Sequence, residues 1–199
     1  MKIPKHVENI LSELEKAGYQ AYLVGGCVRD ILMDRVPFDW DITTNAKPEE
    51  IQKIFIDSVY ENNFGTVSVK IRHEKEGNPS ASSGHFVEVV EVTPFRKEES
   101  YTDKRHPDKV IFTQKVEDDL ARRDFTVNAL AMNLETRNLK PETEGYKLQA
   151  SSYKIIDPFN GEDDIKNKLI RAVGNPKDRF SEDALRMMRA VRFAAQLGF

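Results

Sequence analysis

The spacing of apolar residues predicts a chain that combines helices with short strands. A first helix is expected over residues 4–17, where apolar residues recur at helical spacing, namely Val7, Ile10, Leu11 and Leu14. Apolar or alternating runs predict strands at 21–24, 39–43, 65–72, 86–93, 153–157 and 169–173. Further helical segments are expected at 27–33, 48–55, 116–123 and 163–168.

Three segments lack this periodicity. Residues 96–110 are charged and hold no apolar repeat, so we expect a mobile loop there. Residues 74–84 are polar and rich in Gly and Ser, which favours a long exposed hairpin loop. Residues 135–152 form a second polar excursion, for which the sequence suggests only a surface hairpin.

The longest helix is expected to begin at Ser181, a good N-cap, and to end at Gly198. Its core stripe is predicted at four apolar positions: Leu185, Met188, Val191 and Ala195. Another face carries charged residues about one turn apart: Asp183, Arg186, Arg189 and Arg192. By spacing alone, this face is either a solvated ion-pair surface or a recognition surface.

Composition changes this picture little. The 199 residues are 39% hydrophobic and 32% charged, which is ordinary for a globular protein, and the net charge is −3. No global basic field draws nucleic acid to the chain, so RNA contacts must be local or lie on further chain, and we expect poor tRNA affinity. A single cysteine, Cys27, excludes an internal disulfide or a cysteine-built zinc site. No stretch resembles a signal peptide or a membrane span, so a cytoplasmic protein without membrane contact is expected.

Candidate chemistry is concentrated in residues 21–44. If residues 39–43 form a strand, Asp39 and Asp41 point to the same side, with Cα atoms about 6.5 Å apart. Two such carboxylates can converge on one or two divalent cations. Gly25-Gly26 follows a buried strand and precedes a helix, where backbone N–H groups and Arg29 can meet phosphate. The competing interpretations are an edge strand with its polar face in water and a plain structural turn.

Glu91 is the preferred third carboxylate. In the strand 86–93, Glu91 shares a face with Val87 and Val89, whereas Glu88 points the other way. A carboxylate at the end of an apolar face is costly to desolvate unless a cation meets it. A solvated strand end is the alternative.

The pair Asp183 and Arg186 suits recognition of particular bases. A carboxylate only accepts hydrogen bonds and a guanidinium only donates them. The Watson–Crick edges of cytosine and adenine place an amine donor beside an acceptor nitrogen, whereas uracil and guanine present a carbonyl beside an N–H. The pair therefore matches C and A, and a mismatch that leaves buried groups unpaired can discriminate by about 10⁴.

Five motifs together resemble the class II CCA-adding tRNA nucleotidyltransferases and related bacterial poly(A) polymerases, of the polymerase β-like nucleotidyltransferase superfamily. In chain order they read LVGGCVRDILMDRVPFDWDITT, VEVTPFR, RRDFTVNALAMN, IIDPFNGEDDI and RFSEDALRMMRAVRFAAQLGF. The resemblance implies an α+β fold whose head has a mixed, mainly antiparallel sheet flanked by helices. It places the catalytic head at 1–150, and the end of the head with the first helix of a helical neck at 151–199.

The resemblance also implies roles for individual residues. Catalysis falls to three carboxylates, Asp39, Asp41 and Glu91, of which Asp39 and Asp41 would bind Mg²⁺. The nucleotide-binding residues are implied to be Gly25, Gly26, Arg29, Arg123, Asp124, Asn128, Asp183, Arg186, Arg189 and Arg192. Within this set, Gly26 and Arg29 would hold the triphosphate and Asp183 and Arg186 would select the base.

The implied reaction transfers nucleotides from CTP and ATP to the 3′ end of tRNA and releases pyrophosphate. The segment ENNFGTVSV at 61–69 resembles the CCA-adding type more than the poly(A) polymerases. Residues Tyr101, Asp103 and Arg105, in the segment where the switch from C to A is expected, resemble the complete CCA-adding pattern. Poly(A) addition, addition of CC only or A only, and a non-catalytic nucleotide-binding module stay open as alternatives, as does the oligomeric state.

Overall fold

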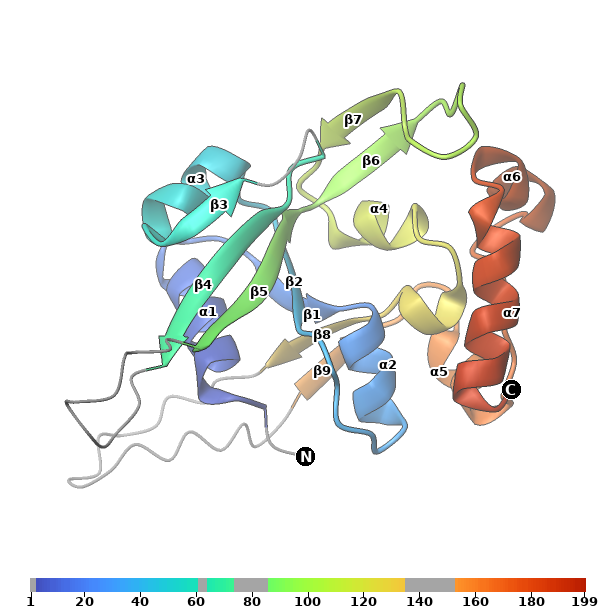
Figure 1. Cartoon of the computed structure of the whole chain (residues 1–199), viewed down its shortest axis with the longest axis horizontal. Coiled ribbons are helices and arrows are strands. Elements are labelled where there is room, and N and C mark those ends of the chain that lie inside the picture. Colours follow the sequence, from blue (N-terminus) through green and yellow to red (C-terminus); the bar gives the residue numbers. More distant parts are fainter. Residues whose placement is uncertain (1–2, 61–63, 74–85, 135–152) are drawn as a thin grey trace.

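The computed structural model describes residues 3–60, 64–73, 86–134 and 153–199 (Figure 1). The helices are α1 (Lys5–Lys16), α2 (Gly26–Leu32), α3 (Pro48–Ile54), α4 (Val116–Ala121), α5 (Gly161–Lys166), α6 (Pro176–Glu182) and α7 (Leu185–Leu197), with a 3-10 turn η1 (Thr126–Asn128). The strands are β1 (Ala21–Val24), β2 (Asp41–Thr44), β3 (Ser58–Tyr60), β4 (Val67–His73), β5 (Phe86–Pro94), β6 (Arg96–Glu99), β7 (Lys109–Phe112), β8 (Ala131–Leu134) and β9 (Tyr153–Ile156). The polar segments 74–84 and 135–152 lie outside the described residues, as does the start of the segment 61–69.

Seven strands form one sheet in the order β3-β4-β5-β2-β1-β8-β9, and β6 and β7 form a separate antiparallel pair. All neighbours in the large sheet are antiparallel except β2 and β5, which run parallel. The expected mixed, mainly antiparallel sheet flanked by helices is therefore confirmed. Figure 1 shows the β6–β7 hairpin above α4 and the red helix α7 at the edge of the molecule away from β3 and β4.

The main core lies between the sheet and the helices α1 and α3. The predicted apolar face of α1 is buried, with Val7 and Leu14 fully inaccessible, and it packs with Ile51 of α3. The sheet supplies alternate residues to the same cluster, including Ile42 and Val92. Burial at these alternating positions fixes the strand registers, because a slip by one residue would turn the apolar side chains outward.

The parallel pairing of β2 with β5 joins two segments that are far apart in sequence. In its register, Asp41 lies beside Glu91 and Thr43 beside Thr93. Side chains of residues opposite each other in neighbouring strands point to the same side of the sheet. The two acidic residues therefore share one face.

Two predicted strands differ from the structure. Strand β2 begins at Asp41, and Asp39 and Trp40 precede it in a bend, so the strand predicted at 39–43 is two residues too early. The strand predicted at 169–173 is wrong: this segment runs beside residues 124–126 and forms a single bridge, between Phe125 and Ala172. Ala172 and Val173 are buried there by packing rather than by sheet pairing, and Leu169 is 42% exposed. Periodicity cannot distinguish this arrangement from a buried strand.

The mobile loop predicted at 96–110 is also wrong, because this segment enters the β6–β7 hairpin. Its inward-facing positions in β6 are Arg96 and Glu98, both partly buried, whereas Lys97 and Glu99 are exposed. Along β6, buried and exposed side chains alternate as in a typical strand, but all four residues are charged, so hydrophobic and polar residues do not alternate. A search for apolar periodicity therefore misses this hairpin.

The single helix predicted from Ser181 is in fact two helices. Helix α6 begins after Asn175, whose side chain accepts a hydrogen bond from the Lys177 N–H, and Pro176 occupies its first turn. Asp183 is extended and separates α6 from α7, and its Oδ1 accepts from the N–H of Leu185 at 2.8 Å. Gly198 ends α7 with φ 74°, as predicted.

The stripe predicted to face the core from α7 instead faces solvent. Leu185, Met188 and Val191 are 46%, 68% and 67% exposed, and Ala195 is exposed. The opposite face is buried and contains Phe193 and Leu197, which pack on Phe125 and Val127 around η1. No described helix is long and apolar enough to span a membrane.

Gly161 allows α5 to pack closely against η1. A Cβ at Gly161 would collide with the backbone carbonyl of Thr126, so Gly161→Ala should lower the free energy of unfolding by about 2 kcal/mol or more through overpacking. Gly174→Ala is the comparison, because its φ of 69° disfavours alanine but nothing lies within 4 Å of the new Cβ, and about 1 kcal/mol is expected. Urea unfolding measures both, and equal losses would contradict a rigid contact.

Candidate active site

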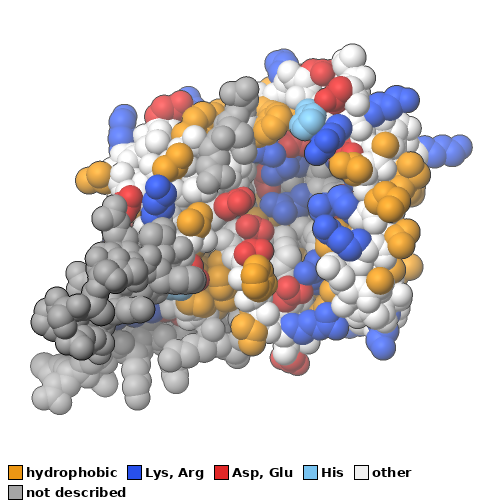
Figure 2. Space-filling view, in the orientation of Figure 1, with side chains coloured by type: hydrophobic (Ala, Val, Ile, Leu, Met, Phe, Trp, Pro, Cys, Tyr) orange, Lys and Arg blue, Asp and Glu red, His pale blue; other side chains and the backbone are white. Residues whose placement is uncertain are grey.

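A cleft of about 520 Å³ lies between the sheet, the β6–β7 hairpin and α7. Its lining residues are Gly26, Arg29, Asp41, Glu98, Arg105, His106, Arg122, Arg123, Asp124, Asn128, Asp183, Leu185, Arg186, Arg189 and Phe193. Nine of these belong to the set of site residues expected from the sequence. Figure 2 shows the hollow, with basic side chains inside it and toward α7, and acidic side chains on the sheet side. Six arginines against four carboxylates in the lining favour an anionic ligand.

Asp39 and Asp41 lie at the start of β2, on the sheet side of the site. Asp39 is exposed and Asp41 is half-buried, while Trp40 and Ile42 between and after them are 7% and 1% exposed. The alternation expected of a strand thus extends back through the bend. The pKa of the Asp41 carboxyl is raised above its usual value, mainly by burial and further by the charge of Asp39, while the charge of Arg123 opposes the shift. The two carboxylates are therefore close enough to repel each other.

Glu91 lies beside Asp41 on the neighbouring strand β5, as the register requires. The reason for expecting a cation there was wrong, however. The face that Glu91 shares with Val89 is the open face, with Val89 46% exposed, whereas Val90 and Val92 point into the core. Glu91 is itself exposed. Strand pairing places Glu91 next to Asp41. Its carboxylate is not buried among apolar groups, so it has no desolvation cost for a cation to offset.

The acidic residues suit a divalent cation whose coordination is completed by oxygen atoms of the substrate. Among the residues described, no group of three or more His, Cys, Asp or Glu side chains is arranged to hold a metal ion by itself. Asp39 and Asp41 offer hard oxygen donors and repel each other, and a bound cation would relieve that repulsion. Magnesium is commonly held by one or two carboxylates together with substrate phosphates, which this pair can provide.

The turn at Gly25 brings the first helix of the site against the RRDFTVNA segment. Gly25 has φ 78°, a conformation that favours glycine, and a Cβ there would lie 2.8 Å from Nη1 of Arg123. Arg29, in α2, donates from Nη1 to Oδ1 of Asn128 at 2.7 Å and from Nε and Nη2 to Asp30. These contacts hold Arg29 and Asn128 together at the cleft.

Arg122 and Arg123 are neighbours in sequence, and both line the cleft. The fully buried carboxylate of Asp119 accepts from Nε of Arg122 at 2.9 Å and from Nη2 of Arg123 at 3.2 Å. Burial opposes the charge of Asp119, yet the two arginines keep its pKa below the usual value. The two guanidiniums reach the same anchor because their side chains are long. Nε of Arg123 is buried without a hydrogen-bond partner among the described residues.

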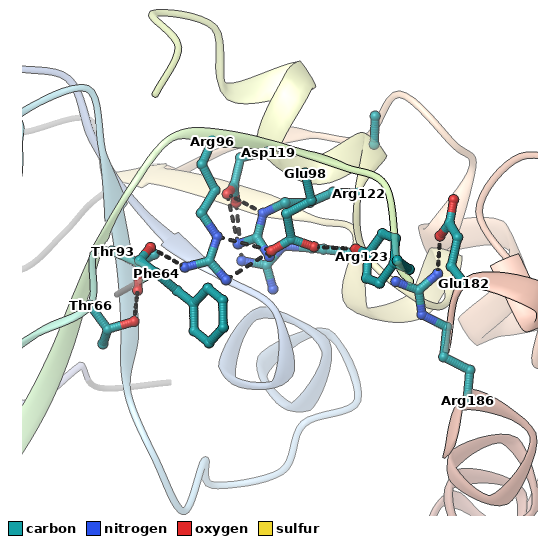
Figure 3. A network of polar contacts seen from close by, with 12 residues as sticks. Phe64, Thr66, Thr93, Arg96, Glu98, Asp119, Arg122, Arg123, Glu182 and Arg186 are labelled. Atoms are coloured by element: carbon teal, nitrogen blue, oxygen red, sulfur yellow. Dashed lines mark hydrogen bonds and ion pairs between the residues drawn. The ribbon is translucent and has the colours of Figure 1, made fainter. Parts of the chain in front are cut away.

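Glu98 connects the hairpin to the cleft (Figure 3). Its side chain, 8% exposed, accepts from Arg96 at 2.9 Å, from Arg122 at 2.9 Å and from the Tyr101 hydroxyl at 2.6 Å. Burial works against its charge, but Arg122, Tyr101 and Arg96 together hold the pKa of Glu98 below its usual range. The ring of Tyr101 in turn lies 5.8 Å from the guanidinium of Arg186, so the hairpin reaches α7.

The residues expected to recognise the base meet at the cleft, but not on one helix face. Arg186 is 8% exposed and donates from Nη1 to Glu182 at 2.6 Å and to the Arg179 carbonyl at 3.1 Å. Asp183 lies in the break before α7 and not within the helix. A solvated ion-pair face is therefore wrong for this part of the chain, because Arg186 is buried at the cleft.

Arg189 and Arg192 have different surroundings. Arg189 lines the cleft and donates from Nε and Nη2 to Oδ2 of Asp124, both at 2.7 Å, which ties α7 to the start of η1. Arg192 does not line the cleft and is exposed. Both guanidiniums lie near the ring of Phe193.

Six lining residues lie outside the expected set of site residues: Glu98, Arg105, His106, Arg122, Leu185 and Phe193. Of these, Arg105 was expected in the segment that controls the switch from C to A. Glu98 and His106 lie in the segment that lacks apolar periodicity, and their place depends on contacts far away in sequence. For Phe193 the sequence does hold a signal. Arg186, Phe193 and Leu197 recur at helical spacing and mark the face of α7 that is actually buried.

The mixed sheet and a cleft lined by carboxylates and arginines define this chain as a nucleotidyltransferase head. Solved structures share the fold. That of the Bacillus stearothermophilus CCA-adding enzyme in complex with CTP has a TM-score of 0.74 and 38% identity, and the match covers 100% of this chain and 41% of that one. A tRNA nucleotidyltransferase complexed with a primer tRNA and an incoming ATP analog has a TM-score of 0.63 and 29% identity, over 96% of this chain and 45% of that one.

The chain belongs to the family of the poly A polymerase head domain, whose profile matches residues 21–171. It is 47% identical over 190 residues to the CCA-adding enzyme of Lactobacillus helveticus, covering 96% of this chain and 40% of that enzyme. It is 44% identical over 190 residues to the CCA-adding enzyme of Listeria innocua, covering 96% and 41%. The chain thus spans about 40% of the length of these relatives. Nucleotidyltransferases of this kind generally use divalent metal ions.

The contacts of Glu98 predict a pH-dependent loss of stability. Glu98→Gln should lower the free energy of unfolding by about 3 kcal/mol at pH 7, because it leaves buried arginines without their counter-charge. Since the pKa of Glu98 is lowered in the folded state, this difference should be complete above the unfolded value of about 4.3 and fade as the pH falls below it.

The neighbouring Glu99→Gln is the control for this measurement. Glu99 is about half exposed and pairs with Lys109 at 3.2 Å, so its loss should change stability by less than about 1 kcal/mol. Urea unfolding of both variants and the wild type at several pH values gives the comparison. A Glu98→Gln effect that is the same at pH 7 and pH 3 would contradict the ionic role.

Proposed function

We propose that this chain is the catalytic head of a CCA-adding enzyme, which transfers nucleotides from CTP and ATP to the 3′ end of tRNA. The observation that carries the proposal is the convergence of the expected nucleotide-binding and metal-binding residues on one cleft. Nine of them line the same 520 Å³ space, and they come from β2, α2, the segment around η1, the α6–α7 break and α7. The relatives named CCA-adding enzyme support the substrate class.

The metal in this proposal is Mg²⁺, held by Asp39 and Asp41. Glu91, beside Asp41 in the register, is the third carboxylate of the catalytic set. When bound, the ion would neutralise phosphate charge and lower the pKa of the attacking hydroxyl. Gly25 and Gly26 allow the backbone to approach the triphosphate, and Arg29 and Arg123 supply positive charge to it.

In the reaction, the 3′ oxygen of the RNA attacks the α-phosphorus of the nucleotide. The bond from the α-phosphorus to the bridging oxygen breaks, and pyrophosphate leaves opposite the attacking oxygen with the electron pair of that bond. The proton of the attacking hydroxyl passes to solvent. The protein contributes positioning and electrostatic stabilisation, because no covalent intermediate with it is required. Asp124 and Asn128 are assigned to the ribose, since Asn128 is fixed by Arg29 and Asp124 by Arg189.

Base selection is assigned to Asp183 and Arg186, with Arg189 and Arg192 extending this site toward the nucleotide. Among the described residues, the contacts of the Arg186 side chain to Glu182 and Arg179 use Nη1, and Asp183 accepts through Oδ1. Nη2 of Arg186 and Oδ2 of Asp183 therefore offer a donor and an acceptor. This combination complements cytosine and adenine and opposes uracil and guanine.

Two further assignments accompany this proposal. Residues 1–150 would form the catalytic head, and residues 151–199 would contain the end of the head and the start of a helical neck. A cytoplasmic location is proposed because tRNA is the intended substrate.

Titration calorimetry with the four nucleoside triphosphates tests the proposal. CTP and ATP should bind in the presence of Mg²⁺, and UTP and GTP should bind at least about tenfold more weakly. Equal binding of all four would contradict base selection by Asp183 and Arg186. Asp41→Asn should abolish the effect of Mg²⁺, whereas Asp34→Asn, the same change at an exposed residue that does not line the cleft, should preserve it.

Incorporation of labelled CTP and ATP into tRNA lacking its 3′ end, resolved on a gel, identifies the reaction. Addition of C, C and A supports the proposal. Products ending in CC, a single A or a run of A would each indicate one of the other activities of the family. Nucleotide binding without incorporation, even when the chain is joined to the part of a relative that lies beyond the match, would favour a non-catalytic module.

The turn at Gly25 gives a separate prediction. Gly25→Ala forces an unfavourable φ and displaces Nη1 of Arg123, so it should weaken CTP binding about tenfold. Gly18→Ala has the same backbone penalty at φ 89° but meets nothing within 4 Å, so it should leave CTP binding unchanged. Calorimetry compares the two, and equal affinities would show that Arg123 does not act on the triphosphate.

A further inference from the structure

Three arginines gather around the ring of Phe193, on the cleft side of α7. The guanidinium carbons of Arg29, Arg189 and Arg192 lie 5.5, 5.2 and 4.9 Å from the centroid of this ring. Arg29 belongs to α2, and the other two belong to α7. The ring is thus the common contact of cations from two helices that are far apart in sequence.

The cluster carries more positive than negative charge. Arg29 is paired with Asp30 at 2.7 Å, and Arg189 with Asp124 at 2.7 Å. Within the described part of the chain, no ion pair is formed by Arg192. Guanidiniums held together repel one another, and a contact that attracts all three of them offsets part of that repulsion.

The ring of Phe193 is suited to this task because its own position is fixed. It is 8% exposed and packs edge-to-face on Phe125, with centroids 5.9 Å apart and planes at 83°. Val127 and Leu197 complete the apolar cluster beneath it. The face of an aromatic ring attracts cations electrostatically, and more strongly when water is excluded.

We propose that Phe193 is a positioning residue for the triphosphate of the incoming nucleotide. It acts through the arginines: it holds Arg29 at the cleft for the phosphates and steadies Arg189, which extends the site from the base toward them, and it does not itself bind phosphate. The inference rests on the proposed function and adds to it the residue that organises the cations. Nothing in the α7 stripe predicted from the sequence pointed to this role.

Replacement of the ring provides the test. Phe193→Leu keeps an apolar side chain but removes the aromatic face, so CTP should bind about tenfold more weakly, and inorganic triphosphate should compete with CTP about tenfold more weakly. The ratio of CTP to UTP affinity should stay the same, because Asp183 and Arg186 are unchanged. Phe193→Tyr retains the aromatic face and should restore both affinities.

Leu197→Ala is the matched control. It removes apolar volume from the same cluster on the same helix, and the one guanidinium described there, that of Arg35, meets the Leu197 backbone carbonyl at 3.3 Å, which the change retains. The variant should therefore lower stability while leaving triphosphate affinity within about twofold. Equal weakening by Phe193→Leu and Leu197→Ala would overturn the proposal in favour of general packing. If Phe193→Leu does not fold, Phe193→Met, which fills the space with a flexible chain, takes its place in the same comparison.

The outcomes separate this inference from the proposed function. A wild-type chain that binds neither CTP nor ATP refutes the proposed function. Wild-type binding of CTP that is unchanged in Phe193→Leu refutes the role of Phe193 alone. Failure of inorganic triphosphate to compete with CTP in the wild type also refutes it, because the cluster would then not be a triphosphate site.

Discussion

The parallel pairing of β2 with β5 is the constraint on which the site depends. Every other neighbour in the large sheet is antiparallel, and this one pairing sets Asp41 beside Glu91. The register is held from the core side, where Ile42 and Val92 are buried at the next position of each strand. A slip by one residue would bury the carboxylates and expose the apolar side chains. The position of the acidic residues is therefore a consequence of core packing.

A second principle governs the basic side of the cleft: three of its six arginines are oriented by carboxylates that are buried behind them. Asp119 holds Arg122 and Arg123, Asp124 holds Arg189, and Glu98 holds Arg122 from the hairpin side. Each carboxylate would be costly to bury alone. Because the guanidiniums have several donors, they satisfy the carboxylate and still present charge to the cleft. Stability and ligand affinity thus draw on the same contacts.

The elements predicted well from the sequence are those whose buried residues are apolar. Helix α1 and strands β1, β4 and β5 are of this kind. The β6–β7 hairpin was missed because Arg96 and Glu98 occupy its inward positions. In α7, amphipathicity indicated two faces, but the apolar stripe faces solvent and the face with Arg186 and Phe193 is buried. The candidate site was largely predictable from carboxylates, glycines and arginines in motifs, whereas Glu98 and Phe193 depend on contacts between distant segments.

The lining of the cleft extends from Gly26 to Phe193, so no contiguous fragment of the chain holds the site. A ligand that binds there binds only when the sheet, the hairpin and α7 are all in place. By linkage, its binding energy is added to the cooperative stability of the whole head rather than to a local segment. Occupancy should accordingly slow amide hydrogen exchange in α1 and β4, neither of which lines the cleft, as well as in the elements that touch the ligand.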